Sequence, residues 1–306
     1  MRRKRYVLQT ILFFAVLGIT FLIAFGDSPL LGKKPSYVLS RPDPVPNEKA
    51  IITRIWAPGL DDGYVPQGVA IAEGAILIST YQSTHPVQDT GPCRVFRIDP
   101  KTGGTTGQFD LPTECGHAGG MEYVGNNVIY VVDTRRLFKI DLSRALQDEN
   151  TNNSLIKSVK LSGDLKGSFL GFDGSDLWIG VYSKTKDAKI YRMPQSVIDK
   201  TQEGETIKPE QAGTALPVSP ASQGAAFDKQ GNLWLTQSSS KFGRLQTIDS
   251  KDGKVLAEYN MVIGVEDITF DEEGRLWSVS EAGTRRWLKW KTLFPIIFQM
   301  DLEKLK

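Results

Sequence analysis

The sequence predicts an all-β fold in the form of a single five-bladed β-propeller. A short apolar strand leads through an acidic-glycine or Asn-rich turn into a second strand, and this pair recurs five times. The pairs recur at intervals of roughly 45–55 residues and contain only strands and turns, which is typical of propeller blades. The second strands are Gly74–Ser79, Asn127–Val132, Asp176–Val181, Asn232–Gln237 and Arg275–Ser280, and their partners are Gly68–Ile71, Gly119–Tyr123, Phe169–Phe172, Gly224–Phe227 and Asp267–Phe270.

Each pair continues into further strands that complete a blade. The clearest is Arg244–Asn260, which reads as a hairpin because an Asp-Gly turn divides two apolar runs. The other third strands are Cys93–Gly103, Arg136–Leu142, Lys189–Pro194 and Pro295–Leu302, and the other outer strands are Gly107–Pro112, Ser154–Leu161 and Thr214–Val218. Trp178, Trp234 and Trp277, with Tyr130 at the aligned position, are predicted to pack between blades.

The fifth repeat ends without an outer strand, and an unpaired strand precedes the first repeat. Ala50–Pro58 reads as a strand with no hairpin partner. Pairing it with the last repeat closes the ring and removes an exposed sheet edge. We therefore expect five blades closed by an N-terminal strand; a sixth blade stays open as an alternative if one unit is too degenerate to recognise.

The N-terminus predicts a transmembrane helix. Arg2, Arg3, Lys4 and Arg5 precede Tyr6–Gly26, which holds no charged side chain. These 21 residues span about 31 Å as a helix, which matches the hydrocarbon core of a bilayer. The basic cluster stays cytoplasmic, so the remainder lies on the extracytoplasmic side. A cleavable signal peptide, with Ala24-Phe25-Gly26 as its site, is the alternative.

The chain divides into an anchor or signal peptide over 1–26, a tether over 27–47 and a propeller over 48–306. The tether is expected because five prolines occur between Asp27 and Asn47 without an apolar period. Without the four N-terminal cations, 33 Lys and Arg face 35 Asp and Glu. The exported part is slightly acidic, which argues against nucleic-acid binding.

The two cysteines predict one disulfide. Cys93 opens the third strand of the first repeat and Cys115 follows the fourth, so both are expected at one face of one blade. An oxidising compartment permits the bond. Two unpaired thiols or a metal-binding pair are the alternatives.

The repeat alignment predicts a ring of polar side chains at the mouth of the central channel. First strands begin, and second strands end, at the same face of a propeller, and such positions on a rigid scaffold often bind ligands. The predicted ligand-binding residues are Gln67, His117, Ser168, Gln223, Glu266 and Glu281; Tyr81, Asp133, Tyr182 and Gln237 end the other second strands. The alternative is that these side chains only solvate strand ends at a wet channel mouth.

Catalytic and metal-binding chemistry has weaker support. No G-x-S-x-G, H-E-x-x-H or phosphate-binding glycine loop occurs. His117 with Asp133, or alternatively with Glu266, is the candidate for a general acid–base pair. Glu266 and Asp267 are the candidate ligands of a Ca²⁺ ion, which takes oxygen donors.

The segment Thr284–Phe298 interleaves basic and aromatic residues. Arg285, Arg286, Lys289 and Lys291 alternate with Trp287, Trp290 and Phe294. On a tethered protein this pattern suits anionic lipid headgroups. The expectation we favour is an inter-strand loop whose tryptophans pack against the propeller.

The repeats resemble those of the gluconolactonase, senescence-marker and strictosidine-synthase-like propeller superfamily. The segments that carry the resemblance are VPQGVAI, GGMEY with VIYVVDT, SQGAAFDKQGNLWL and VEDITFDEEGRLWSV, within about Val65–Val279. VPQG followed by GHAGG is also similar to uncharacterised exported bacterial propellers. The resemblance implies a divalent ion held at inner-strand starts; Glu266 is the matching carboxylate, whereas Gln67, Gln223 and Gly119 depart from the ligand pattern.

Two functions follow as expectations. The first is a membrane-tethered extracytoplasmic propeller that binds a small molecule or a protein at its channel mouth. The second is a Ca²⁺-dependent lactonase or esterase of the gluconolactonase kind.

Overall fold

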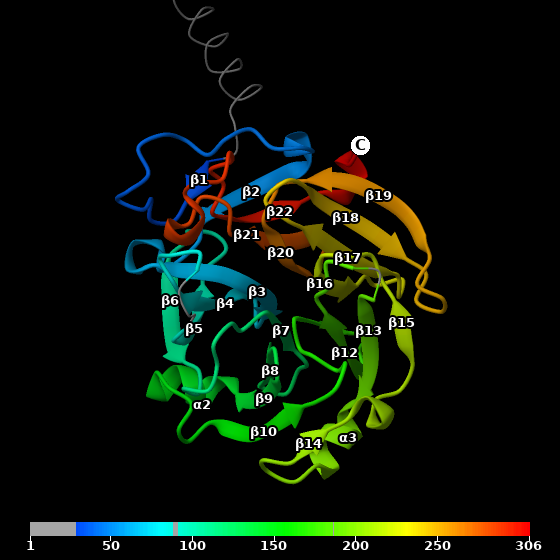
Figure 1. The fold of residues 1–306 in the computed structure, drawn as a ribbon. Helices are drawn as coiled ribbons and strands as arrows, with labels where there is room; N and C mark the ends of the chain where they lie inside the picture. Colours follow the sequence, from blue (N-terminus) through cyan, green and yellow to red (C-terminus); the bar gives the residue numbers. More distant parts are fainter. Residues whose placement is uncertain (1–28, 88–90, 186) are drawn as a thin grey trace, which may run out of the picture.

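A computed structural model describes residues 29–87, 91–185 and 187–306 (Figure 1). These residues form five antiparallel sheets arranged around one axis, which confirms the predicted five-bladed propeller. Within them no helix is both long and apolar enough to cross a membrane. The predicted anchor at Tyr6–Gly26 lies outside the described residues, so it stays a prediction.

Blades 1, 3 and 4 are four-stranded sheets in chain order from the axis outward. Blade 1 contains β3 (Tyr64–Ala72), β4 (Ala75–Gln82), β5 (Cys93–Ile98) and β6 (Thr105–Asp110). Blade 3 contains β11 (Phe169–Phe172), β12 (Asp176–Val181), β13 (Lys189–Pro194) and β15 (Ala215–Pro217). Blade 4 contains β16 (Ser222–Phe227), β17 (Leu233–Ser238), β18 (Gly243–Ile248) and β19 (Val255–Met261).

Blade 2 carries a fifth strand that the repeat pattern did not predict. It contains β7 (Gly120–Tyr123), β8 (Val128–Asp133), β9 (Arg136–Asp141), β10 (Leu155–Leu161) and β14 (Thr206–Ile207), with β14 parallel to β10. Two short helices, α2 (Leu142–Asp148) and α3 (Gln195–Lys200), directly follow β9 and β13. The Asp141 side chain caps α2 by accepting from the Arg144 N–H at 3.0 Å.

Blade 5 is closed by the N-terminal strand, as predicted. Its inner strands are β20 (Val265–Phe270), β21 (Leu276–Ser280) and β22 (Ile296–Met300). The next strand outward is β2 (Ile51–Trp56), antiparallel to β22, so that Ile55 lies opposite Ile297. The short strand β1 (Leu30–Leu31) pairs parallel to β2 and covers its edge.

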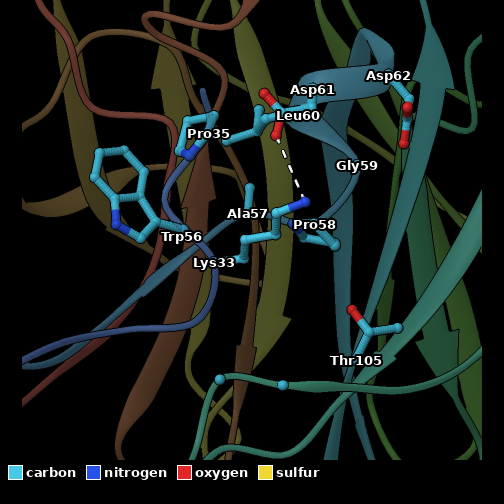
Figure 2. Close-up of a pocket in the computed structure, with 12 residues that line it drawn as sticks. Lys33, Pro35, Trp56, Ala57, Pro58, Gly59, Leu60, Asp61, Asp62 and Thr105 are labelled. Atoms are coloured by element: carbon cyan, nitrogen blue, oxygen red, sulfur yellow. Dashed lines mark ion pairs between the residues drawn. The ribbon is translucent and has the colours of Figure 1, made fainter. Parts of the chain in front are cut away.

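The predicted tether is packed on the propeller over the part that the structure describes. Val38 and Val45 are buried, and the Ser36 N–H and hydroxyl both donate to Asp61 at 2.7 Å. Figure 2 shows this junction, where Lys33 and Asp61 face one another across a cavity of about 150 Å³. The buried apolar residues of this segment are isolated and separated by prolines. Their spacing follows no strand or helix period, so the sequence did not predict that they pack.

The core lies between neighbouring blades. Trp178, Trp234 and Trp277 are buried in these inter-blade clusters, as expected. Each indole N–H also donates to an aspartate in the turn between the first two strands of its blade: Asp173, Asp228 and Asp271, at 2.9, 2.9 and 3.0 Å.

Candidate functional site

The five innermost strands pack side by side around the axis and leave little space between them. Glycines permit this approach near the channel mouth. A Cβ on Gly119 would lie 2.2 Å from the Ser168 carbonyl oxygen, and one on Gly224 would lie 2.5 Å from the Asp267 Cα. The predicted mouth residue Ser168 therefore serves this contact through its backbone.

Two buried carboxyl groups face one another at the channel mouth. Glu266 lies on β20, and Glu281 follows β21, the adjacent strand of the same blade. Glu266 is 2 % exposed and Glu281 is 7 % exposed. Gln67 from blade 1 donates its amide to Glu281 at 3.2 Å, and Gln223 from blade 4 donates to Glu266 at 3.3 Å. The structure thus brings four predicted residues from three blades together.

Burial decides the protonation of this pair. It raises the pKa of Glu281 to about 7, although the Arg286 guanidinium opposes the shift. Burial, together with the neighbouring Glu281 carboxylate, raises the pKa of Glu266 well above its usual value. Two adjacent carboxyl groups in a dry site cannot both ionise readily. The pair therefore still holds a proton at neutral pH, and Glu281 is the first of the two acids to ionise.

Asp267 follows Glu266 in sequence but serves a different purpose. Its Oδ2 accepts the backbone N–H groups of Val69 on β3 and Met121 on β7, each at 3.3 Å. It is fully buried, which raises its pKa well above the usual value. Asp267 therefore joins blades 1, 2 and 5 near the axis. Glu122 on β7, which the sequence did not single out, is a further buried acid whose pKa burial raises.

The predicted pair His117 and Asp133 meets through the backbone. The Asp133 carboxylate accepts the backbone N–H of His117 at 2.7 Å, so it holds the loop and does not orient the imidazole. The His117 ring stacks on Tyr81 with centroids 4.9 Å apart. Burial lowers the pKa of His117, and Arg286 acts in the same direction.

The loop of residues 281–295, here called the mouth loop, folds over this cluster. The Arg286 guanidinium lies 5.4 Å from the centre of the Tyr81 ring and donates to the Pro86 carbonyl at 3.1 Å. The Trp287 indole lies beside Glu281 and stacks on Trp290 at 4.8 Å. The tryptophans therefore pack as expected. The sequence named these residues, but the loop is too irregular for any period to have placed them at the channel mouth.

Polar groups without partners gather at the same end. Within the described part of the chain, the buried Gln237 Oε1, Thr284 Oγ1 and Arg286 Nε have no hydrogen-bond partner. Such atoms are uncommon in folded proteins and often mark a position that a bound molecule completes. A separate groove of about 350 Å³ is lined by Asp164, Lys166, Val181, Tyr182, Ser183, Asp187, Lys189 and Tyr191. Burial, and after it the charges of Glu266 and Glu281, raise the pKa of Tyr182 in this groove.

The predicted metal ligands Glu266 and Asp267 do not act together. Glu266 faces Glu281 and Gln223, whereas Asp267 faces backbone N–H groups. Among residues 29–87, 91–185 and 187–306, no group of three or more His, Cys, Asp or Glu side chains is placed to hold a metal ion. Any cation at the mouth therefore depends on Glu266 with Glu281 and on the neutral amides beside them.

The two cysteines are buried neighbours without a covalent bond. Cys93 and Cys115 are 1 % and 2 % exposed and belong to one apolar cluster. The adjacent Cys115 thiol and burial raise the pKa of Cys93. The predicted disulfide stays a prediction that this proximity allows.

Comparisons with known proteins gave only distant structural similarities. No family model and no curated protein matches the chain. Similar solved structures include a protein of unknown function from Bacteroides caccae (TM-score 0.42, 8 % identity, 71 % of each chain). Hydrazine synthase from Kuenenia stuttgartiensis is similar at TM-score 0.41 and 11 % identity over 71 % of this chain and 64 % of the other. The PQQ-bound aldose sugar dehydrogenase from Streptomyces coelicolor is similar at TM-score 0.42 and 15 % identity over 71 % and 74 %. Function is therefore inferred below from this chain's own residues.

Proposed function

We propose that this protein is a membrane-tethered extracytoplasmic propeller that binds a small polar ligand at its channel mouth. One observation carries the proposal: Glu266 and Glu281 face each other in a buried site with amides from two other blades. Burying adjacent acids destabilises a folded chain unless something compensates. Strongly perturbed carboxyl groups in a concave polar site are typical of ligand-binding and catalytic sites.

The ligand is inferred from the groups around the pair. Carboxyl oxygens accept hydrogen bonds, whereas Gln67 and Gln223 offer both donors and acceptors. The Trp287 indole beside Glu281 adds aromatic surface there. The groove that Tyr182 lines, separate from the carboxyl pair, measures about 350 Å³ and is large enough for a compact small molecule. We infer an uncharged polyhydroxylated ligand, since its hydroxyl groups match this mixture and its ring face suits the aromatics.

A pair of matched variants tests this function. Glu266→Gln keeps the shape of the side chain and removes one acid, so we expect unchanged or higher thermal stability together with loss of binding. The probes are D-glucose, myo-inositol and glycerol, measured by calorimetric titration. Glu272→Gln, at an exposed turn, is the control. If Glu266→Gln lowers stability and no probe binds the unmodified protein, the carboxyl pair is structural and the proposal fails.

The tether is supported by Tyr6–Gly26 and its basic flank. We expect the full chain to resist extraction from membranes by alkaline carbonate. The propeller is expected to be digested by protease added from the extracytoplasmic side. Release at alkaline pH, with a mature N-terminus near Asp27, would instead establish a cleaved signal peptide.

A Ca²⁺-dependent lactonase is the second candidate, and the carboxyl pair is again the observation that favours it. A bound Ca²⁺ would replace the shared proton and draw on Glu266, Glu281 and the amide oxygens of Gln67 and Gln223. Excess CaCl₂ at pH 7.5 would then raise the melting temperature, and chelator would reverse the change. Hydrolysis of D-glucono-δ-lactone that depends on Ca²⁺ and on Glu266 supports this candidate; an unchanged melting temperature removes it.

A further inference from the structure

The N-terminal segment and the mouth loop lie side by side at one rim of the propeller (Figure 1). The Tyr37 hydroxyl donates to the Gly283 carbonyl at 3.2 Å, and the Arg285 guanidinium lies 4.7 Å from the centre of the Tyr37 ring. Asp43 and Leu293 exchange two hydrogen bonds, at 2.9 and 2.7 Å. Residues 33–41 and 285–291 therefore form one surface, here called the basic rim.

The basic rim is charged with one sign. Residues 33–41 and 285–291 contain seven cations and no acid, whereas the rest of the chain from Glu48 onward has more acids than bases. Arg285 and Arg286 are used in contacts within the fold. The exposed cations are Lys33, Lys34, Arg41, Lys289 and Lys291, of which Lys33 also lies 3.8 Å from Asp61.

Two large apolar side chains project from the same rim. Leu39 is 93 % exposed and Leu288 is 51 % exposed, each on a segment that also carries exposed cations. Leucines surrounded by lysines and arginines suit the interface of a bilayer, where the apolar groups enter the acyl boundary and the cations meet the headgroups. A protein partner of opposite charge would match the cations but would not require bare leucines beside them.

Chain length places the rim close to a bilayer. If the predicted span ends at Gly26, six residues precede Lys33. Six extended residues cover at most about 21 Å. The first cation of the rim therefore cannot lie far from the membrane surface, and this step rests on the proposed tether.

We propose that the basic rim lies on the anionic lipid surface of the membrane that anchors the chain, with Leu288 inserted at the level of the headgroups. In this arrangement lipid contacts one side of the mouth loop, and the residues around Glu266 and Glu281 contact its other side. Because the attraction is electrostatic, it requires anionic lipid and weakens with salt.

A spin label at Leu288→Cys, in the full-length chain reconstituted into vesicles, tests the proposal. In 70:30 phosphatidylcholine:phosphatidylglycerol we expect loss of most collisions with an aqueous nickel chelate and a gain of collisions with oxygen. In pure phosphatidylcholine, or in 1 M NaCl, the label is expected to return to water. The control label is Leu256→Cys, which is 59 % exposed on the distant β18–β19 hairpin.

Charge-reversal variants distinguish lipid contact made by the basic rim from attachment through the N-terminal anchor. Lys289→Glu with Lys291→Glu is expected to return the 288 label to water, whereas Lys251→Glu with Lys254→Glu on the β18–β19 hairpin leaves it in place. A 288 label as accessible to nickel as the 256 label, or buried equally in both lipids, overturns the proposal. A chain that fails to float with either vesicle contradicts the tether, and so it also overturns the rim proposal.

Discussion

Carboxyl groups have opposite environments at the two ends of the inner strands. One end, the turn end, carries the turn between the first two strands of a blade, and the other, the mouth end, lies at the channel mouth. At the turn end, Asp228 accepts an indole N–H, an amide and backbone N–H groups, all between 2.8 and 3.0 Å. At the mouth end, Glu266 and Glu281 each accept one amide from a neighbouring blade and face one another, with Trp287 and Arg286 also close to Glu281. Although burial raises it, the hydrogen bonds to Asp228 hold its pKa below the usual value, whereas burial raises the pKa of Glu281 to about 7.

This difference separates carboxylates that build the fold from carboxyl groups that weaken it. A carboxylate saturated with donors stabilises the folded chain. A buried acid beside another acid destabilises its own ionised form and the fold with it. Because a chain retains such a pair against its own stability, the mouth end is where we place function.

Asp267 gives the most direct test of the contrast between turn-end and mouth-end carboxyl groups. It lies toward the mouth, yet its carboxylate accepts hydrogen bonds from backbone N–H groups. Asp267→Ala leaves the Val69 and Met121 N–H groups buried without an acceptor. Each such loss costs about 1–3 kcal/mol, so we expect a free energy of unfolding lower by about 3–5 kcal/mol. Urea unfolding measures it. Asp267→Asn, which keeps an acceptor, is expected to lose less than half as much; equal losses would show that charge matters more than hydrogen bonding.

The pH dependence of stability should have opposite signs at the two ends. Folded Glu281 keeps its proton up to about pH 7, whereas the unfolded chain releases it near 4.5. Between these values the folded state binds more protons, so raising the pH lowers stability, by up to about 3 kcal/mol. Asp228 has the reverse effect: its contribution is present above the usual aspartate pKa and is lost as the pH falls below it.

Glu281→Gln is therefore expected to make the stability curve less steep between pH 4.5 and 7, as followed by thermal unfolding, while the other buried acids keep their part of the slope. Asp228→Asn is the control, and it should leave this interval unchanged. An equal slope in the Glu281→Gln protein would mean that Glu266, Asp267 or Glu122 carries the proton uptake.

Removal of a turn-end carboxylate gives the next largest effect. Asp271 accepts from the Trp277 indole at 3.0 Å and from the Gln299 amide at 2.7 Å. Asp271→Ala is expected to lower the free energy of unfolding by about 2 kcal/mol, since charged hydrogen bonds to buried donors are lost. The adjacent exposed Glu272→Ala should change it by less than about 0.5 kcal/mol. Similar losses in the two proteins would contradict the structural assignment of Asp271.

The smallest effect is expected when an indole donor is removed and its acceptor kept. In Trp234→Phe, Asp228 still accepts from the Asn232 amide at 2.8 Å, so about 1 kcal/mol is lost on unfolding in urea. The loss of stability at acid pH should also become smaller, because one donor no longer lowers the pKa of Asp228. An unchanged loss at acid pH would mean that the backbone donors suffice.

Local periodicity explains what the sequence could predict. Strand alternation and turn residues located all five blades and the closing strand at residues 51–56, because a strand pair is encoded within a few consecutive positions. Alignment of the repeats also placed Gln67, Gln223, Glu266 and Glu281 at one face. Gln223 and Glu266 are the second residues of their first strands, Glu281 follows a second strand, and Gln67 lies within β3. The repeat itself therefore fixed the height of these side chains along the axis.

The residues that the sequence could not place depend on non-local packing. Asp267 and Glu266 are neighbours in sequence, yet alternation sends one toward the axis and the other toward Glu281. Arg286 and Trp287 reach the mouth through an irregular loop, and residues 29–47 pack through isolated side chains between prolines. Neither feature has a period, so only the folded contacts reveal it.

The pairing of β2 with β22 sets the order in which the molecule can be completed. Residues 51–56 precede the first four blades in the chain, whereas their hydrogen-bonding partner at residues 296–300 follows all four. Four blades can form as local hairpins while the ring stays open, with the edge of β2 unpaired. A chain that stops before residue 296 therefore leaves that edge of β2 without its partner, and an unpaired edge strand can pair with other chains and aggregate.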